Sequence, residues 1–123
     1  MSVLNRSLSV VAFLLFAGAC YSADAAPKYD MKKYKGVAEE ALKLVKSADY
    51  AGAAKKTVEL ETAWDDDTKK LKEANRKVWK AADDQMDVAM KACEAAKDAT
   101  SAEKATKELN GFIALLAEVE KLK

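Results

Sequence analysis

Apolar residues recur at alternating steps of three and four positions through most of the chain beyond Pro27. The clearest example is a single stripe formed by Trp79, Ala82, Met86, Ala89, Cys93 and Ala96. This spacing places the side chains on one face of an α-helix, and no stretch shows the alternation of a strand. The chain beyond Pro27 has no further proline and is rich in Ala, Lys, Glu and Leu, which favour helix.

Polar residues that cap or stop helices divide this pattern. The first predicted helix covers residues 30–46. Asp49 is suited to cap a second helix, which should reach Lys70 or beyond, and Asn75 is the best candidate for the turn before a third. Each of these helices carries one apolar stripe, so each must pack against another element to bury it.

A fourth helix is predicted from Thr100, with Glu103 reaching back to complete a capping box. Its apolar stripe is formed by Ala105, Leu109, Phe112, Leu116 and Val119. Four amphipathic helices joined by short turns predict an all-α fold, an antiparallel up-down-up-down four-helix bundle. A dimerising helical hairpin is the competing arrangement, which the alanine-rich stripes and short heptads disfavour.

The two tryptophans are predicted to be packing residues at different levels of the bundle. Counting the helical rise from a turn near Asn75 places the Trp64 ring against Ala82 and the Met86 sulfur, away from Trp79. The three aspartates at residues 65–67 should then leave the core by rotation around the helix.

The N-terminal segment has the pattern of an export signal. Arg6 precedes a short apolar run, and Ala23-Asp24-Ala25 is typical of a signal-peptidase site. We therefore expect a signal peptide at residues 1–25 and a helical-bundle domain at residues 26–123, periplasmic or secreted. The alternative is that the stretch "AGAC" is a lipoprotein signal. Cys20 would then carry a lipid anchor, and the protein would be an outer-membrane lipoprotein. No later apolar run is long enough for a membrane span.

Charge and composition exclude several functions. The net charge is +1, with lysines scattered among acids, which argues against nucleic acid or an anionic membrane as the main partner. The sequence has no histidine, so histidine-ligated haem, the usual zinc sites and Ser-His-Asp catalysis cannot be built. We therefore predict no cofactor and no enzymatic activity.

Two patterns of side chains could still hold a metal ion. Met86, Met90 and Cys93 share one helix face, and their thioether and thiol groups suit Cu(I). The same positions lie on the apolar stripe, however, and a buried structural Cys93 is the simpler interpretation. Asp83 and Asp87, one helical turn apart, could hold a divalent ion weakly, although acids near a helix start also favour its dipole.

Part of the sequence resembles small exported bacterial helical-bundle proteins of unassigned function. The shared pattern consists of Asp49, Tyr50, Ala53, Ala54, Leu60, Glu61, Trp64, Trp79, Asp84 and Asp87. This resemblance implies export and a helical bundle but no activity. The architecture is also similar to that of four-helix-bundle cytochromes, with Met31 where one haem ligand could lie and the matching histidine missing.

Taken together, these patterns predict an exported, non-enzymatic helical bundle that acts through interaction with a protein partner or with itself. The alternative is a periplasmic protein that binds a small ligand or a metal ion, copper in the case of Met86, Met90 and Cys93.

Overall fold

The computed structural model describes residues 28–123, so the predicted signal peptide and Cys20 lie outside the described residues. This part of the chain is helical and contains no strand. Its elements are α2 (Lys32–Lys46), α3 (Tyr50–Asp67), α4 (Lys69–Ala74), α5 (Arg76–Ala95) and α6 (Ala99–Glu120). The predicted all-α fold is therefore confirmed.

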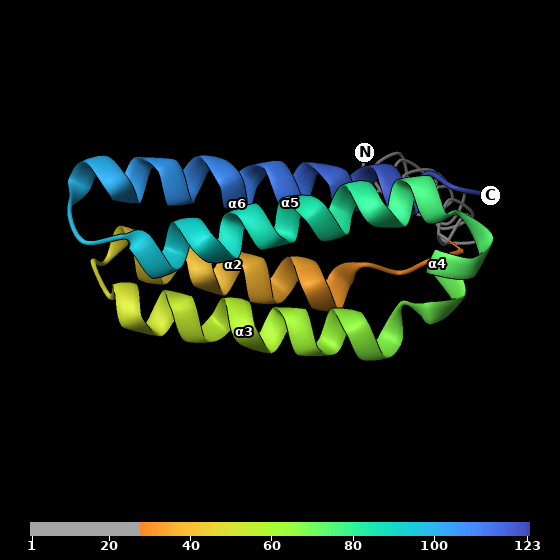
Figure 1. Ribbon diagram of the computed structural model, residues 1–123, viewed down its shortest axis with the longest axis horizontal. Coiled ribbons are helices and arrows are strands. Elements are labelled where there is room, and N and C mark those ends of the chain that lie inside the picture. Colours follow the sequence, from red (N-terminus) through yellow and green to blue (C-terminus); the bar gives the residue numbers. More distant parts are fainter. Residues whose placement is uncertain (1–27) are drawn as a thin grey trace, which may run out of the picture.

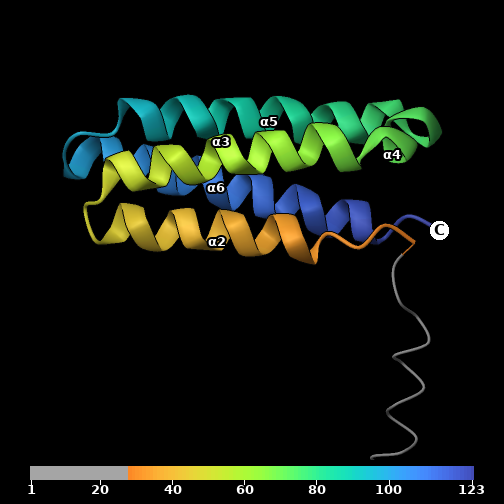
Figure 2. The same cartoon turned by 90° about the horizontal axis from the view of Figure 1, so that it is seen from below.

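The four long helices lie side by side and form a helical bundle, as Figures 1 and 2 show. Helix α2 packs on α3 and α6, and α5 packs on the same two helices. The short helix α4 lies at one end of the bundle in the connection from α3 to α5 (Figure 1). Each long helix thus buries its apolar stripe against two neighbours, which is why none has to be stable alone.

The helix α4 was not predicted from the sequence, since the second helix was expected to continue to Lys70. It ends instead at Asp67, and Thr68 separates it from α4. The Thr68 hydroxyl donates a hydrogen bond to the Trp64 carbonyl oxygen and accepts one from the Trp79 indole N–H at 2.8 Å. A threonine that bonds back one turn competes with the backbone ladder and bends a helix.

Two of the three predicted helix caps are confirmed. The Asp49 side chain accepts a hydrogen bond from the Gly52 N–H at 3.0 Å, and the Asn75 side chain accepts one from the Val78 N–H at 3.1 Å. Both residues satisfy a backbone N–H that has no partner within its own helix.

The predicted start of the last helix at Thr100 was wrong. Helix α6 begins at Ala99, with Asp98 as its N-cap and Ser101 as the returning partner of a capping box. The Asp98 carboxylate accepts from the Ser101 N–H at 2.9 Å, and the Ser101 hydroxyl accepts from the Asp98 N–H at 3.1 Å. A charged carboxylate two residues earlier forms the stronger cap, so Thr100 lies within the first turn and Glu103 is exposed.

The core consists of two clusters with different side-chain sizes. The cluster at the α4 end holds the large side chains, among them Trp64, Phe112, Leu60 and Met86. The other is built mainly from alanines around Leu109. Large side chains bury most apolar surface, so we expect the α4 end to contribute most of the stability.

Trp64 is fully buried in the cluster that also contains Ala82 and Met86, as predicted. The predicted separation of the tryptophans was wrong, because the rings of Trp64 and Trp79 stack with centroids 6.3 Å apart. The prediction measured the height of each tryptophan from a turn near Asn75. In the structure, α3 already ends at Asp67, and α4 fills the connection. Each tryptophan is therefore three residues from the end of its long helix, at the same level.

Replacement of Trp64 by alanine should lower the free energy of unfolding by about 3–5 kcal/mol, because it removes the largest buried side chain and leaves a cavity. Urea unfolding followed by circular dichroism measures this difference. Asp66→Ala, which alters an exposed side chain two residues away, should change it by less than about 0.5 kcal/mol. A Trp64→Ala variant as stable as the wild type would contradict the packing role.

Candidate functional site

Four carboxylates gather where α3 packs against α5. Glu61 and Asp65 lie one turn apart on α3, and Asp83 and Asp87 lie one turn apart on α5. Burial raises the pKa of Glu61, and the negative charges of Asp65, Asp87 and Asp83 raise it further. The two pairs therefore lie close enough to repel each other, and we call Glu61, Asp65, Asp83 and Asp87 the acidic patch.

The pKa of Asp83 is also raised, first by burial and then by the charges of Asp87, Asp65 and Asp84. No lysine or arginine forms a salt bridge with any residue of the acidic patch within residues 28–123. The acids that do form salt bridges lie elsewhere and are Glu40, Glu59, Asp67, Asp84 and Glu118. The patch thus concentrates negative charge without a salt bridge, although Lys69 and Lys72 line the same pocket as Asp65.

A buried polar atom lies against this patch. The Trp64 indole nitrogen Nε1 is fully buried and has no hydrogen-bond partner in the part of the chain that the structure describes. It lowers the pKa of Asp83, although burial and the neighbouring acids outweigh this effect. A buried donor without a partner is unusual in proteins, and here it favours the ionised form of Asp83.

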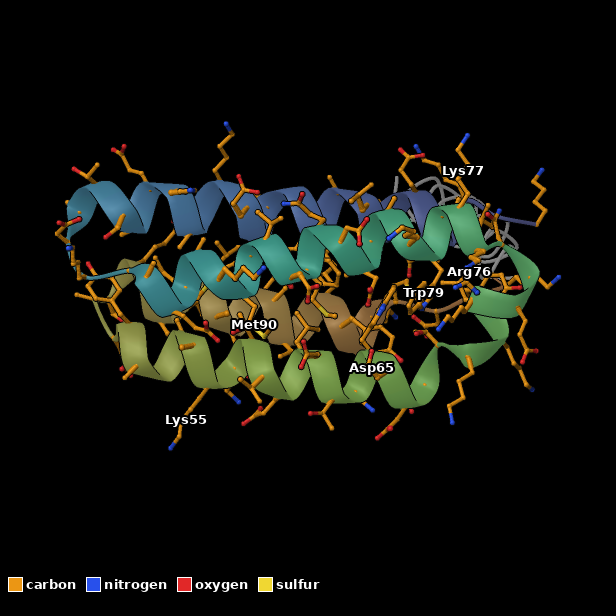
Figure 3. The ribbon with its side chains drawn as sticks, viewed as in Figure 1. Lys55, Asp65, Arg76, Lys77, Trp79 and Met90 are labelled. Atoms are coloured by element: carbon orange, nitrogen blue, oxygen red, sulfur yellow. The ribbon has the colours of Figure 1, made fainter. Side chains whose placement is uncertain are left out.

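The acidic patch offers only oxygen ligands, which hard cations such as Ca²⁺ and Mg²⁺ prefer. Asp65 is exposed and lies on the face between α3 and α5, where Met90 of α5 also lies (Figure 3). Within residues 28–123, no three histidine, cysteine or acidic side chains surround one point closely enough to hold an ion by direct contacts alone. A cation held here would keep part of its water shell.

The sequence pointed to only half of this patch. The pair Asp83 and Asp87 was considered as a weak divalent site. Glu61 was noted only in the pattern shared with small exported helical proteins, and Asp65 only among the three aspartates expected to leave the core. Their spacing of four residues was visible in the sequence. The packing of α3 against α5, which joins the two pairs, was not.

The predicted soft-metal residues Met86, Met90 and Cys93 lie in different surroundings. Met86 belongs to the large-residue cluster and Cys93 to the alanine-rich one, while Met90 is half-buried. The predicted burial of Cys93 is confirmed, at 1% exposure. Burial raises the pKa of the Cys93 thiol to about 11, which disfavours the thiolate that binds metals. A copper site at these residues stays a prediction.

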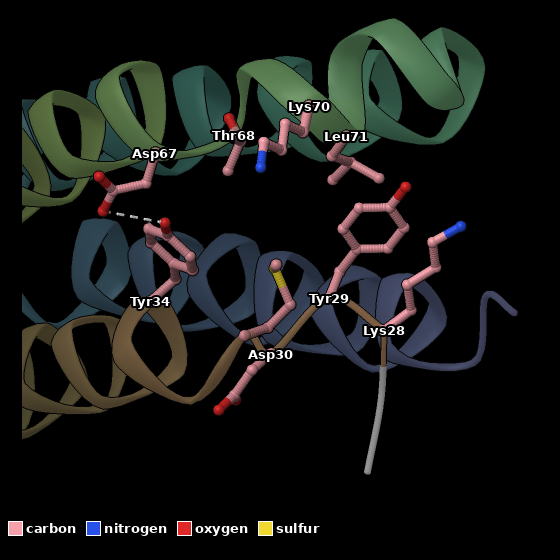
Figure 4. A pocket seen from close by; sticks show the side chains of 9 residues that line it. Lys28, Tyr29, Asp30, Tyr34, Asp67, Thr68, Lys70 and Leu71 are labelled. Carbon is pink, nitrogen blue, oxygen red and sulfur yellow. Dashed lines mark hydrogen bonds between the residues drawn. The ribbon is translucent and has the colours of Figure 1, made fainter. Parts of the chain in front are cut away.

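A pocket of about 370 Å³ opens at the α4 end of the bundle (Figure 4). Its lining includes Met31, Tyr34 and Asp67. The Tyr34 hydroxyl donates a hydrogen bond to Asp67 at 3.1 Å, and the Lys33 ammonium group lies 2.9 Å from the same carboxylate. Met31, for which the cytochrome-like architecture suggested a ligand role, is 4% exposed and packs in the core.

Comparison with known proteins leaves the site to be interpreted from its own geometry. No protein-family model matches the chain, and no curated protein or solved structure matches it. Among residues 28–123, no helix is long and apolar enough to cross a membrane.

In the predicted exported chain, residues 26–123, Cys93 is the only cysteine. We expect it to react with Ellman's reagent only after unfolding in guanidinium chloride, because the thiol is buried and protonated. The positive control is the double variant Cys93→Ala and Ala81→Cys, which places a thiol at an exposed position of the same helix. Rapid reaction of native Cys93 would show that the thiol is accessible.

Proposed function

We propose that this protein binds a hard divalent cation, Ca²⁺ or Mg²⁺, at the acidic patch between α3 and α5. The observation that carries the proposal is the set of four carboxylates on two packed helices, none of which forms a salt bridge within residues 28–123 and two of which have a raised pKa. Carboxylates that repel one another in the absence of a partner attract a divalent cation, which neutralises several of them at once.

The pKa shifts support a ligand role over a stabilising one. The raised pKa values of Glu61 and Asp83 mean that folding disfavours their ionised forms. The ionised patch therefore lowers stability at neutral pH, and stability sacrificed at one cluster is typical of a functional site. A cation removes this cost, so its binding and the stability of the bundle are linked.

The exposure of the patch indicates a weak, water-rich site. Asp65 is exposed, and the other three side chains are half-buried. Mg²⁺ usually keeps several waters in protein sites, and Ca²⁺ accepts water among its six to eight oxygen ligands. Extracellular calcium modules bind with dissociation constants of about 10⁻⁴–10⁻³ M, and this range suits an exported protein.

The proposal also covers the direction of the four long helices and the export of the protein. We infer that the four long helices run up-down-up-down, with α4 as part of the second connection. Figure 2 supports this inference, because the connections from α2 to α3 and from α5 to α6 lie at one end of the bundle and the connection from α3 to α5 lies at the other. From the sequence patterns we also propose that the segment at residues 1–25 directs export and that the protein is not an enzyme. Interaction with a protein partner stays a prediction without assigned residues.

Divalent cations should raise the melting temperature of the protein, because they bind the folded form. At a free ion concentration of one hundred times the dissociation constant, the gain is about 2.7 kcal/mol. Thermal unfolding in CaCl₂ or MgCl₂ measures the shift, with KCl at equal ionic strength as the control for screening. Glu61→Gln, Asp83→Asn and Asp87→Asn should each weaken binding by about tenfold or more, since even outer-shell partners contribute that much.

The matched control is Glu39→Gln, which removes one exposed glutamate charge from α2 and should leave cation binding unchanged. An equal shift in all variants would place the cation elsewhere. Absence of any shift up to about 10 mM, well above the dissociation constants of weak extracellular sites, would refute the proposal.

Glu61→Gln should make the cation-free protein more stable than the wild type at neutral pH. The pKa of Glu61 is raised in the folded state, so this group stabilises the fold at low pH. That contribution to the free energy of unfolding is lost as the pH rises above the usual carboxylate range, about pH 4. Removing this group should therefore raise the melting temperature at neutral pH by a few degrees and flatten the pH dependence between about pH 4 and 6. Unfolding curves across that range, compared with Glu39→Gln, measure the difference. Lower stability of Glu61→Gln at neutral pH would contradict the repulsion inferred here.

A further inference from the structure

The α4 end of the bundle carries a concentration of positive charge. Residues 69–80 contain six lysines and arginines and a single acid, Glu73. Of the six, only Lys80 forms a salt bridge within residues 28–123, with Asp84. The Lys72 ammonium group lies 4.5 Å from the centroid of the Trp79 ring. The run therefore leaves several cationic groups without an acidic partner.

The start of the described chain adds to this charge. Lys28 and Lys70 line the pocket at this end, beside the ring of Tyr29 and the side chain of Leu71 (Figure 4). Asp67, the last residue of α3, also lines this pocket and is already bound to Lys33 and Tyr34. Asp30 also lines the pocket, so its lining is balanced in charge, and the positive charge of this end lies on the exposed surface around it.

Arg76 and Lys77 lie at the start of α5, at the end of the bundle where α4 lies (Figure 3). We call Lys28, Lys69, Lys70, Arg76 and Lys77 the basic end. All five are exposed and form no salt bridge in the part of the chain that the structure describes. They come from two segments that are distant in sequence and that the fold brings to one end of the bundle.

We propose that the basic end docks on a bilayer surface rich in anionic phospholipid, where its cationic groups meet the headgroup phosphates. The net charge of +1 argued against an anionic membrane because the lysines are scattered along the sequence, but the fold gathers the five cationic groups of the basic end, and such clusters are attracted to anionic surfaces. The predicted export segment precedes Lys28, so the chain enters the bundle at this same end. Cys20, the alternative lipid-anchor site, precedes Lys28 by eight positions, and a fully extended chain of that length reaches at most about 29 Å.

The order of the chain favours phospholipid over nucleic acid as the partner. A basic surface alone fits both, because both present phosphates. The predicted signal peptide would take the bundle out of the cytoplasm, where nucleic acid lies, and into a compartment bounded by membranes. Asp65 of the acidic patch lines a pocket with Lys69 and Lys72, but none of the five residues of the basic end is a ligand of the proposed cation site, so this proposal does not rest on cation binding.

The test compares binding of the chain at residues 26–123 to vesicles of phosphatidylcholine with and without phosphatidylglycerol. This chain contains both core clusters and lacks the apolar N-terminal run and Cys20, so neither can contribute. We expect binding only to the vesicles with phosphatidylglycerol. Each lysine near such a surface contributes about fivefold to affinity, so Lys69→Gln, Lys70→Gln and Lys77→Gln together should lower it roughly 100-fold.

The matched control is the triple variant Lys55→Gln, Lys91→Gln and Lys104→Gln, which removes the same charge from exposed positions outside the basic end. It should change vesicle affinity by less than about threefold, because these lysines lie far from the docked surface. An equal loss in both triple variants would mean that net charge alone matters and would overturn the proposal. The same conclusion follows if the wild type does not bind the anionic vesicles.

Two further measurements separate the sources of phosphate. Inorganic phosphate at the concentration of accessible lipid should not displace the protein from vesicles, because a surface engages several cationic groups at once. Complete displacement would reassign the basic end to a soluble phosphate. Tighter binding to a short DNA duplex than to the vesicles, lost in the basic-end variant, would replace the membrane by nucleic acid.

Discussion

The buried ring of Trp64 is the contact on which the arrangement of this bundle depends. It meets Tyr34 of α2 and Phe112 of α6 edge to face, with centroids 5.5 and 5.9 Å away, and stacks on Trp79 of α5. One side chain of α3 thus contacts all three other long helices, in geometries that aromatic pairs favour. The break at Thr68 belongs to the same unit, since its hydroxyl links the Trp64 carbonyl to the Trp79 indole.

This aromatic core also determines the electrostatics beside it. The Trp64 indole affects the pKa of Asp83, and the packing of α3 on α5 brings Glu61 and Asp65 close enough to affect the same carboxylates. The apolar contacts have to compensate for the repulsion that this packing creates. The candidate cation site is therefore a consequence of how the core is built, and its stability at neutral pH depends on the same helix pair.

The sequence allowed much of the fold and little of the site to be predicted. Asp49 and Asn75 were identified as caps because a cap depends on residues within one turn of the chain. Thr100 was chosen wrongly because Asp98 offered a competing local cap, which forms a reciprocal pair of hydrogen bonds with Ser101. The level of Trp79 was predicted wrongly because a single early break at Thr68 shifts everything that follows.

The sequence by itself determined the helical content, the apolar stripes and the burial of residues such as Trp64 and Cys93, because these follow from periodicity and side-chain chemistry within one helix. It also contained both charge patterns, as two acid pairs and one basic run. Only the tertiary structure decided that Glu61 joins Asp83 across two helices, and that Lys28 lies beside Lys70 at one end of the bundle. Net charge and local spacing say nothing about such partners. Electrostatic energy depends on distance in space, and helix packing alone sets that distance.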